Sequence, residues 1–290
     1  MKETRGTRSA RAGACWIIWR IKTFSERAGT RQEQKQTVIF KTNGLILKQQ
    51  NIGERDKLVW ILTQSHGILR AFARGAKNIK SPKCAGTGLL SYSALSVFEG
   101  RDSYSVDEAV SLEQFTGLQR DIEKLALAQY FSELCLHLCP VGQEADEQLR
   151  LMLNSLYILA NDKRPRAQVK VCFEMRLIAM SGYMPDLVMC AGCGEYETPE
   201  MVFVPHTGKL FCSACAEKQG VQGVRLPAAA VTALRHAVYA DADKLFSFVL
   251  KEELWEPLSL ASEQYVAYMT QKDYPTLQFY KSMGNIGNRE

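Results

Sequence analysis

The chain has 290 residues, and its 46% hydrophobic and 23% charged residues are typical of a globular protein of about two domains. No apolar run reaches the roughly 18–20 residues that a membrane span requires, and the short run CWIIW is followed closely by Arg20 and Lys22, which argues against a signal-peptide core. The net charge of +5 is uneven, because residues 1–36 carry nine Lys and Arg against three Glu and the remainder carries a net −1.

Residues 1–36 are rich in arginine and show little periodicity. Three interpretations compete: a basic arm that contacts nucleic acid, a targeting peptide, or an extension produced by an over-long gene start. We favour the last, because regular patterning begins only with TVIFKTNGLILK at Thr37. We therefore predict a basic extension over residues 1–36 that is disordered or foreign to the fold.

Residues 37–110 have the pattern of a small β-domain. Five short runs are rich in β-branched and aromatic residues, namely VIFKTNGLILK, DKLVWILTQ, GILRAFARGA, LLSYSALSVFEG and RDSYSVDEAV. Five strands within a segment of this length suit a small barrel or a sandwich, and an OB-type barrel has five strands and a groove that accepts oligonucleotides. The alternation slips near Ala94–Leu95, which indicates a β-bulge.

The remaining chain is predicted to form a helical domain over residues 111–189 and 221–290, interrupted by a cysteine-rich module over 190–220. The periodicity predicts one long helix between Leu112 and Pro140, a second over 144–160 and a third over 166–181, which Gly182 ends. The apolar positions assigned to one face of the first helix are Phe115, Leu118, Ile122, Leu125, Phe131, Leu134 and Leu138.

Two further helices are predicted after the cysteines, in LPAAAVTALRHAVYA and LWEPLSLASEQYVAYMTQ, and YPTLQFYKSM closes the pattern as a short tail. Leu260, Tyr265 and Met269 are expected to face inward. Cys135 and Cys139 lie one turn apart in the first helix, but nothing nearby completes a metal-binding set. We expect these two thiols to be buried core residues. The fold class expected is α+β.

Two Cys-x-x-Cys pairs dominate the stretch CAGCGEYETPEMVFVPHTGKLFCSAC, with eighteen residues between Cys193 and Cys212. Two sulfurs of one such pair can reach one ion from a tight turn, and Gly192 and Gly194 favour that turn. The pattern predicts one Zn²⁺ bound by four cysteines, Cys190, Cys193, Cys212 and Cys215.

Four thiolates leave zinc no open coordination position, which favours a structural ion over a catalytic one. His206 could serve as an alternative ligand, but its place before Thr-Gly at a predicted turn favours a surface residue. A thioredoxin-type redox role would need one Cys-x-x-Cys in a βαβ unit, which the pattern does not show. The odd number of nine cysteines and the lack of a signal peptide indicate reduced thiols in the cytoplasm.

A basic segment, RAFARGAKNIKSPK, follows the third predicted strand, and no acidic residue falls between Asp56 and Glu99. Its glycines, serine and proline predict a flexible loop that can follow a phosphate backbone without reading sequence. The candidate DNA-binding residues are Arg70, Arg74, Lys77, Lys80 and Lys83. Phe72, Tyr92 and Tyr104 are candidates for base stacking, against the simpler interpretation of a solvated loop and core aromatics.

Three longer stretches carry a family resemblance. They are GLILKQQNIGERDKLVWILTQSHGILRAFARGAKNIKS, FEMRLIAMSGYMPDLVMCAGCG and YPTLQFYKSM. They resemble the RecO recombination mediators of bacterial DNA repair over about residues 37–285. All four cysteine positions are present here, although some members of that family lack the full set.

The resemblance implies an N-terminal OB barrel, a helical bundle and a zinc module packed on that bundle. It further implies a bacterial cytoplasmic protein that is associated with the nucleoid and does not bind a membrane. Such a protein binds single- and double-stranded DNA and anneals complementary strands. Such a protein helps to load recombinase onto DNA coated with single-strand-binding protein, in the RecF pathway of double-strand break and gap repair. The implied partners are RecR and the C-terminal tail of the single-strand-binding protein.

No catalytic residue is expected, and the chain contains no G-x-x-x-x-G-K-[ST] nucleotide motif. Two alternatives remain open: a zinc-ribbon interaction module of the transcription machinery, and a zinc-dependent enzyme that acts on nucleic acid. Annealing of complementary oligonucleotides without ATP would distinguish the three hypotheses.

Overall fold

The structure is a computed structural model that describes residues 38–101 and 103–287. The basic extension predicted over residues 1–36 lies outside the described residues. All elements discussed below belong to a single unit of the chain. Within the described ranges, no helix is both long and apolar enough to cross a membrane.

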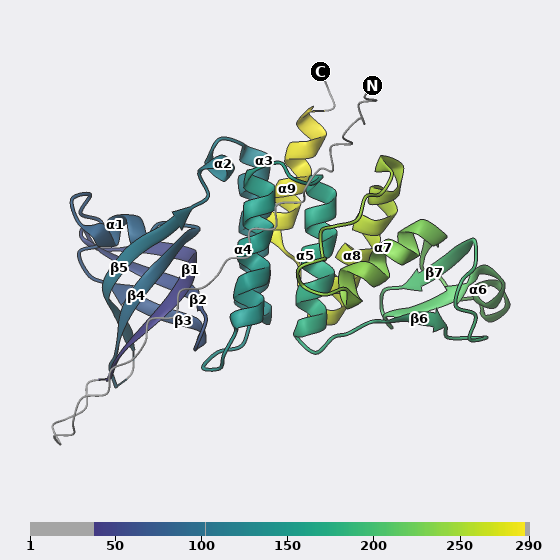
Figure 1. The fold of residues 1–290 in the computed structure, drawn as a ribbon, viewed down its shortest axis with the longest axis horizontal. Helices are drawn as coiled ribbons and strands as arrows, with labels where there is room; N and C mark the ends of the chain where they lie inside the picture. Colours follow the sequence, from purple (N-terminus) through teal and green to yellow (C-terminus); the bar gives the residue numbers. More distant parts are fainter. Residues whose placement is uncertain (1–37, 102, 288–290) are drawn as a thin grey trace, which may run out of the picture. The chain divides into compact units, whose positions relative to one another are not determined.

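Five strands form the N-terminal part of the described chain, as the sequence predicted. They are β1 (Val38–Ile52), β2 (Asp56–Thr63), β3 (Gly67–Ala73), β4 (Ser91–Glu99) and β5 (Tyr104–Gln114). The strands close into a barrel in the order β1-β2-β3-β5-β4, with all pairs antiparallel except β3 and β5 (Figure 1).

Alternate residues of these strands fill the barrel. The interior holds larger side chains such as Ile46, Val59 and Ile61 opposite small ones such as Ala71 and Ala109. The β4–β5 ladder shifts register between Tyr92 and Ser93 and again between Ser96 and Val97. These two irregularities flank the position where the sequence predicted a bulge.

The loop predicted after β3 contains a helix, α1 (Pro82–Gly86), so the prediction of an irregular loop was wrong there. Pro82 fits the first turn because a helix start needs no backbone donor. Gly86 lies so close to β5 that a Cβ atom would come within 2.8 Å of Ala109. The short helix therefore packs directly on the barrel wall.

The long helix predicted from Leu112 to Pro140 is also wrong in its first part. Strand β5 runs to Gln114, a single turn α2 (Thr116–Gln119) follows, and the helix α3 (Ile122–Leu138) begins later. Asp121 sets this start, because its carboxylate accepts hydrogen bonds from the backbone N–H groups of Glu123 and Lys124. Ile122, predicted to face inward, is 61% exposed.

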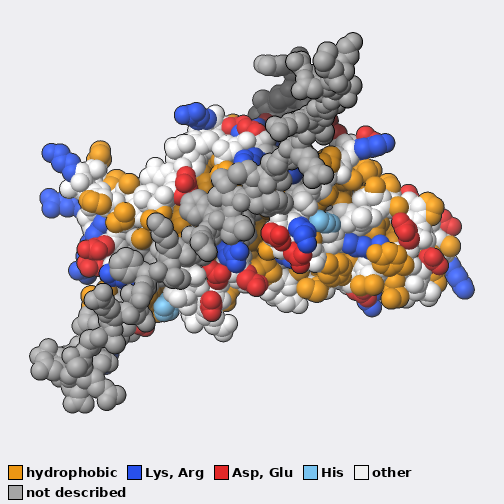
Figure 2. All heavy atoms as spheres, viewed as in Figure 1, with side chains coloured by type: hydrophobic (Ala, Val, Ile, Leu, Met, Phe, Trp, Pro, Cys, Tyr) orange, Lys and Arg blue, Asp and Glu red, His pale blue; other side chains and the backbone are white. Residues whose placement is uncertain are grey.

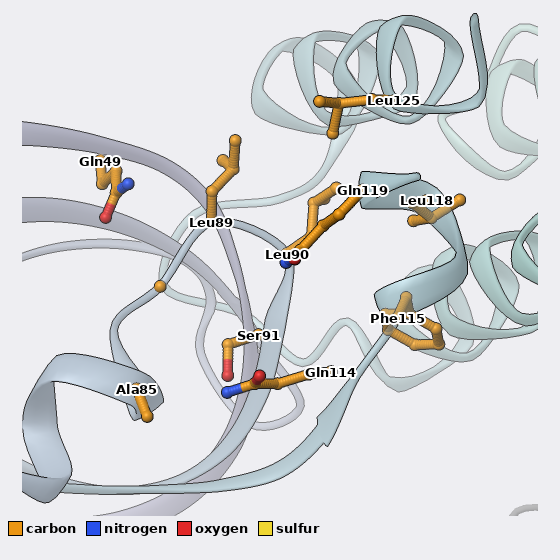
Figure 3. Close-up of a pocket in the computed structure, with 11 residues that line it drawn as sticks. Gln49, Ala85, Leu89, Leu90, Ser91, Gln114, Phe115, Leu118, Gln119 and Leu125 are labelled. Carbon is orange, nitrogen blue, oxygen red and sulfur yellow. The ribbon is translucent and has the colours of Figure 1, made fainter. Parts of the chain in front are cut away.

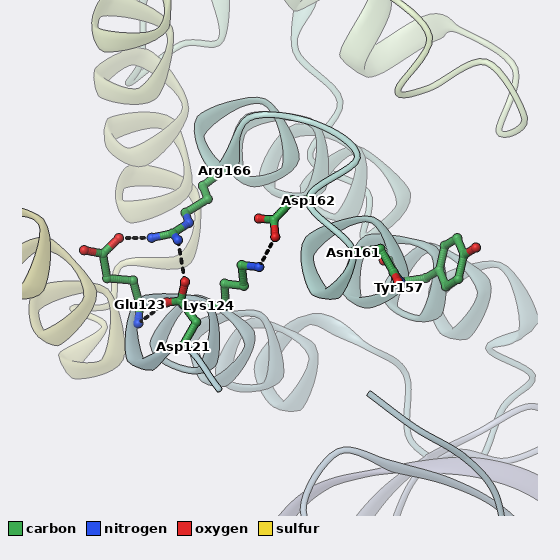
Figure 4. A network of polar contacts seen from close by, with 7 residues as sticks. All are labelled: Asp121, Glu123, Lys124, Tyr157, Asn161, Asp162 and Arg166. Carbon is green, nitrogen blue, oxygen red and sulfur yellow. Dashed lines mark hydrogen bonds and ion pairs between the residues drawn. The ribbon is translucent and has the colours of Figure 1, made fainter. Parts of the chain in front are cut away.

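Ion pairs fasten the start of α3 to the following helices (Figure 4). Arg166, the first residue of α5 (Arg166–Met180), pairs with Asp121 through Nη2 at 2.6 Å and with Glu123 through Nη1. Lys124 is buried and pairs with Asp162, which follows the helix α4 (Asp146–Ala160). The capping residue of α3 is thus also a partner of α5.

The helices that follow the cysteine module are α7 (Ala228–Tyr239), η1 (Glu252–Leu254), α8 (Trp255–Thr270) and α9 (Pro275–Gly287). The predicted C-terminal tail is therefore helical. Tyr265 is buried as expected, but Leu260 is 45% exposed, contrary to the prediction. Cys135 and Cys139 are buried, which confirms their interpretation as core thiols.

A buried polar network links α3, α5, α8 and α9. Lys170 lies 2.9 Å from the Glu174 carboxylate and 3.0 Å from the Glu263 carboxylate, and Lys281 of α9 lies 2.7 Å from Glu263. The hydroxyls of Tyr130 and Ser262 donate to Glu174. Each buried charge therefore has several partners, as burial requires.

The turn between β2 and β3 contacts the segment between α3 and α4. The N–H of Ile68 donates to the carbonyl of Pro140 at 2.8 Å, and the N–H of Gly142 donates to the carbonyl of His66 at 3.0 Å. Gly67 sits in this contact with φ +59°, and a Cβ atom there would lie 2.0 Å from the Pro140 oxygen. Glycine is required by both the conformation and the close approach.

Candidate metal centre and candidate nucleic-acid interface

The four predicted cysteines are carried by a small sheet and one short helix. The sheet has the strands β6 (Asp186–Cys190), β7 (Glu200–Val204), β8 (Lys209–Cys212) and β9 (Val224–Pro227), in the order β6-β8-β7-β9, and α6 (Ser213–Gln219) follows β8. Cys190 and Cys212 end two adjacent strands, and Cys215 lies in the first turn of α6. The fold therefore brings both Cys-x-x-Cys pairs to one point.

The geometry of the four sulfurs fits a tetrahedral metal ion. All four Sγ atoms lie within 4.8 Å of one another, and those of Cys193 and Cys212 are 3.8 Å apart. Tetrahedral zinc–thiolate bonds place sulfurs roughly 3.8 Å apart. Cys190, Cys193, Cys212 and Cys215 would therefore be the ligands of such an ion.

Backbone N–H groups point at these sulfurs. Cys190 Sγ accepts from the N–H groups of Gly192 at 3.3 Å and Cys212 at 3.2 Å, and Cys212 Sγ accepts from that of Cys215 at 3.4 Å. Burial raises the pKa of Cys190, but the N–H donors outweigh it and lower that pKa to about 6. Cys190 thus favours thiolate, the form that binds metal, whereas hydrogen bonds with the thiols of Cys212 and Cys193 raise the pKa of Cys215 to about 12.

The two glycines of the first pair are explained by the geometry. A Cβ atom on Gly192 would lie 3.0 Å from the sulfur of Cys215, and Gly194 has φ +79°. His206 is exposed and packs edge-on against Tyr268, which agrees with the prediction that it is a surface residue.

Arg235 of α7 holds β6, the strand that ends at Cys190. Its guanidinium donates to the carbonyls of Leu187 at 2.6 Å, Val188 at 3.0 Å and Tyr196 at 2.8 Å, and it lies 4.2 Å from the centre of the Tyr196 ring. The hydroxyl of Tyr239, also on α7, donates to the carbonyl of Pro185. The cysteine module is therefore fastened to the helices on the Cys190 side.

The five candidate DNA-binding residues lie on β3 and in the segment that follows it. Arg70 and Arg74 are exposed and alternate with buried alanines, so they face outward. Lys80 is exposed, and Lys77 donates to the carbonyl of Gly53 in the turn between β1 and β2 at 3.1 Å. Lys83 lies on α1, where its ammonium donates to the carbonyl of Val106 at 3.3 Å.

Figure 2 shows Lys and Arg side chains projecting at the end of the barrel where α1 lies. The segment after β3 is held there by the turn between β1 and β2: the N–H of Lys77 donates to the carbonyl of Arg55, and that of Gly75 donates to the Asp56 carboxylate. Arg55 is exposed at this end but was absent from the sequence-based set. Arg55 lies near Lys77 because the turn between β1 and β2 packs against the segment after β3.

The structure separates the three aromatic candidates for base stacking. Phe72 is 39% exposed between Arg70 and Arg74, and Tyr104 is half-buried beside Phe40. Tyr92 is only 3% exposed, so its selection as a stacking residue was wrong. Trp60 was overlooked, although the short turn between β2 and β3 places it opposite Arg70.

A cavity of about 330 Å³ lies between the segment after α1 and the start of the helices (Figure 3). Its walls carry the apolar side chains of Leu89, Leu90, Phe115, Leu118 and Leu125, with amides from Gln49, Gln114 and Gln119. These lining side chains include no acid, base or thiol. The one hydroxyl in the lining, that of Ser91, lies 3.1 Å from the Ser93 hydroxyl and 3.0 Å from the Ser111 hydroxyl, so the lining offers no base to activate it.

Comparison with known proteins identifies the family. Residues 38–115 match the family described as "Recombination protein O N terminal", and residues 119–278 match "Recombination protein O C terminal". The chain belongs to the RecO family. The two matched segments divide at α2, between the barrel and α3.

Several RecO relatives match over nearly their whole length. The "DNA repair protein RecO" of Acetivibrio thermocellus is 32% identical over 247 residues, which cover 85% of this chain and 98% of the relative. Proteins of the same name from Symbiobacterium thermophilum and Alkaliphilus metalliredigens are each 26% identical, covering 84% and 85% of this chain and 98% and 100% of the relatives. This RecO-family chain is thus a protein of DNA repair and recombination.

Proposed function

We propose that this RecO-family protein is a DNA-binding recombination mediator that anneals complementary strands. In double-strand break and gap repair it would help to load recombinase onto DNA coated with single-strand-binding protein, as part of the RecF pathway. The observation that carries the proposal is family membership together with an outward-facing basic surface on the barrel. The strand order β1-β2-β3-β5-β4 supports an OB-type barrel, a fold that binds oligonucleotides.

Annealing is explained by charge neutralisation. Two complementary strands repel each other through their phosphates, and binding to Lys and Arg releases the condensed counterions that screen them. Arg70, Arg74 and Lys80 face solvent on or beside β3, with Arg55 and Lys77 at the same end of the barrel. A surface that holds both strands lowers their repulsion, and base pairing then supplies the specificity. This mechanism needs no catalytic residue.

The experiment is a salt titration of binding with the substitutions Arg70→Ala, Arg74→Ala, Lys77→Ala and Lys80→Ala combined. Affinity for labelled duplex and single strands should fall, and the slope of log K against log salt should flatten by about 0.9 per lost phosphate contact on duplex. The matched control replaces four exposed lysines elsewhere, Lys209, Lys218, Lys244 and Lys251, with the same loss of charge.

An unchanged slope in the first variant would remove these residues from the interface. Equal losses of DNA affinity in both variants would mean that binding depends only on the net charge of the protein. A purified wild-type protein that binds neither strand form at low salt would contradict the proposed function itself. Annealing of complementary oligonucleotides without ATP separates the mediator from a transcription-type interaction module and from a metal-dependent enzyme.

We further propose that the cysteine cluster holds one structural Zn²⁺. The fit of four sulfurs to a tetrahedral ion supports this, and a fully ligated ion leaves no position for water or substrate. When bound, the ion would cross-link the ends of β6 and β8 and the first turn of α6. The metal would thus stabilise the module and would not take part in DNA binding.

RecR and the C-terminal tail of the single-strand-binding protein are the proposed protein partners, and the proposed location is the bacterial cytoplasm at the nucleoid. Family membership supports recombination partners in general. Co-purification of the wild-type protein with each partner, with and without DNA, tests this assignment. Binding only in the presence of DNA would argue against direct contact.

A further inference from the structure

Three side chains form a row across the outer face of the barrel. Register places Lys48 of β1 opposite Trp60 of β2, and Trp60 opposite Arg70 of β3. The ammonium of Lys48 lies 5.1 Å from the centre of the Trp60 ring, and the guanidinium carbon of Arg70 lies 5.5 Å from it. An indole thus stands between two cations, one from each neighbouring strand.

Alternation along the strands shows that this row faces out of the barrel. Val59 and Ile61, on either side of Trp60, are buried in the barrel interior, and so is Ala71 next to Arg70. Lys48 faces outward because the β1–β2 register shifts between Ile46, which points inward, and Lys48. A bulge re-aims the following side chains in this way. Lys48 and Arg70 are exposed, and Trp60 is half-buried.

The row continues into the basic surface along β3. Phe72 and Arg74 follow Arg70 on the same face, so aromatic and cationic side chains alternate there. In the part of the chain that the structure describes, Trp255 is the other tryptophan, and it is only 5% exposed. Trp60 is therefore the indole that a ligand can reach among the described residues.

We propose that the row Lys48–Trp60–Arg70 is a stacking site for an unpaired DNA base. This inference rests on the proposed function and names the residue that would distinguish single strands from duplex. A base in a single strand offers its π-face to an aromatic ring, whereas both faces of a base inside a duplex are already stacked. The phosphates of the same strand meet the flanking cations. A stacking base displaces one flexible cation from the indole, and that cation then neutralises a neighbouring phosphate.

The first test compares Trp60→Ala with Trp60→Phe, measuring the dissociation constant for single-stranded and duplex oligonucleotides at the same salt concentration. Trp60→Ala should weaken single-strand binding about tenfold and duplex binding by less than about twofold. Trp60→Phe should recover most of the loss, because it restores a ring without the indole. Tyr268→Ala, which removes an aromatic residue 57% exposed on α8, should change neither constant.

A second measurement does not depend on loss of function. In a chain with Trp16→Phe and Trp19→Phe, the fluorescence comes from Trp60 and the buried Trp255. Titration with single strands should quench Trp60, and titration with duplex should quench it much less. Unfolding curves of each variant exclude a folding defect as the cause of weaker binding.

The outcomes separate this inference from the proposed function. If the wild-type protein binds no DNA, the proposed function fails. If it binds DNA but Trp60→Ala leaves the ratio of single-strand to duplex affinity unchanged, only the stacking site is overturned. Equal losses for both strand forms, or equal quenching by both, would likewise overturn it and would assign Trp60 to a contact that single strands and duplex share.

Discussion

Cys193 is the exposed member of the four-cysteine cluster, whereas Cys190 and Cys212 are buried. Without a metal, replacing an exposed thiol by a hydroxyl should hardly change stability. With a bound ion the same change removes one of four ligands, and metal binding is coupled to folding. We therefore predict that Cys193→Ser loses its bound metal and melts several degrees lower, as measured by elemental analysis and thermal unfolding.

The half-buried thiol of Cys84 lies outside the cluster and supplies the control. Cys84→Ser should retain the metal and the wild-type melting temperature, and a chelator should bring the wild type down to the melting temperature of Cys193→Ser. A Cys193→Ser protein with normal stability, made from a wild type that contains no metal, would refute the structural ion.

The cysteines could be assigned from sequence because the chemistry depends on spacing along the chain. Cys-x-x-Cys brings two sulfurs together locally, and only the meeting of the two pairs needs the fold. Trp60 and Lys48 are the opposite case. Their contact depends on the register of β1 against β2 and on a one-residue bulge, neither of which alternation alone specifies.

Among the elements, the five barrel strands and most helices were predicted correctly, and the errors have physical causes. Phe115 and Leu118 sit at helical spacing ahead of α3, but the Asp121 cap and its pair with Arg166 start the helix later. A cap is a short-range signal, whereas Arg166 lies 45 residues away along the chain. The helix α1 was not predicted, because the glycine and proline residues in its sequence are also typical of loops.

Helix α9 is held in part through Glu263 of α8, which pairs with Lys170 and Lys281. Burial raises the pKa of Glu263, but the two lysines outweigh it, so the pKa of the folded state lies below the usual 4.5. A carboxyl with a lowered folded-state pKa stabilises the protein above its unfolded-state pKa, and this contribution is lost as the pH falls. Glu263→Gln should therefore cost about 2 kcal/mol of unfolding free energy at pH 7.

The measurement is urea unfolding of both proteins between pH 7 and pH 3. The difference between wild type and Glu263→Gln should be constant near neutrality and shrink below about pH 4.5, because the wild-type carboxyl then takes up a proton. A difference that grows on acidification would contradict the assigned direction of the pKa shift. A difference near zero at pH 7 would show that the ion pairs are too well solvated to stabilise the protein.

At the scale of the whole molecule, barrel closure and the contact between the barrel and the helices could not be predicted from local sequence patterns. The alternation predicted five strands, but the parallel β3–β5 pair that closes the barrel joins residues 33 positions apart. The contact of Gly67 with Pro140 likewise joins the turn between β2 and β3 to a predicted helix end. The sequence marks Pro140 as a helix end, but its pairing with Gly67 requires the fold.

The Gly67 contact provides a test of how strongly the barrel is coupled to the helical part. Gly67 and Gly53 both have a positive φ, +59° and +56°, but a Cβ atom at Gly53 would meet nothing within 4 Å. Gly53→Ala should therefore cost only the backbone penalty of about 1–2 kcal/mol. Gly67→Ala adds a clash with the Pro140 carbonyl, so we expect a larger loss, about 3–5 kcal/mol in total.

Urea unfolding followed by circular dichroism and by hydrogen exchange measures both variants. If the contact couples the two parts, Gly67→Ala should make the β-strands and the helices unfold in separate transitions. Gly53→Ala should lower the stability but leave the number of unfolding transitions as in the wild type. Equal losses in the two variants would mean that the turn moves away from Pro140 at little cost. The barrel and the helices would then be joined mainly through β5 and α2.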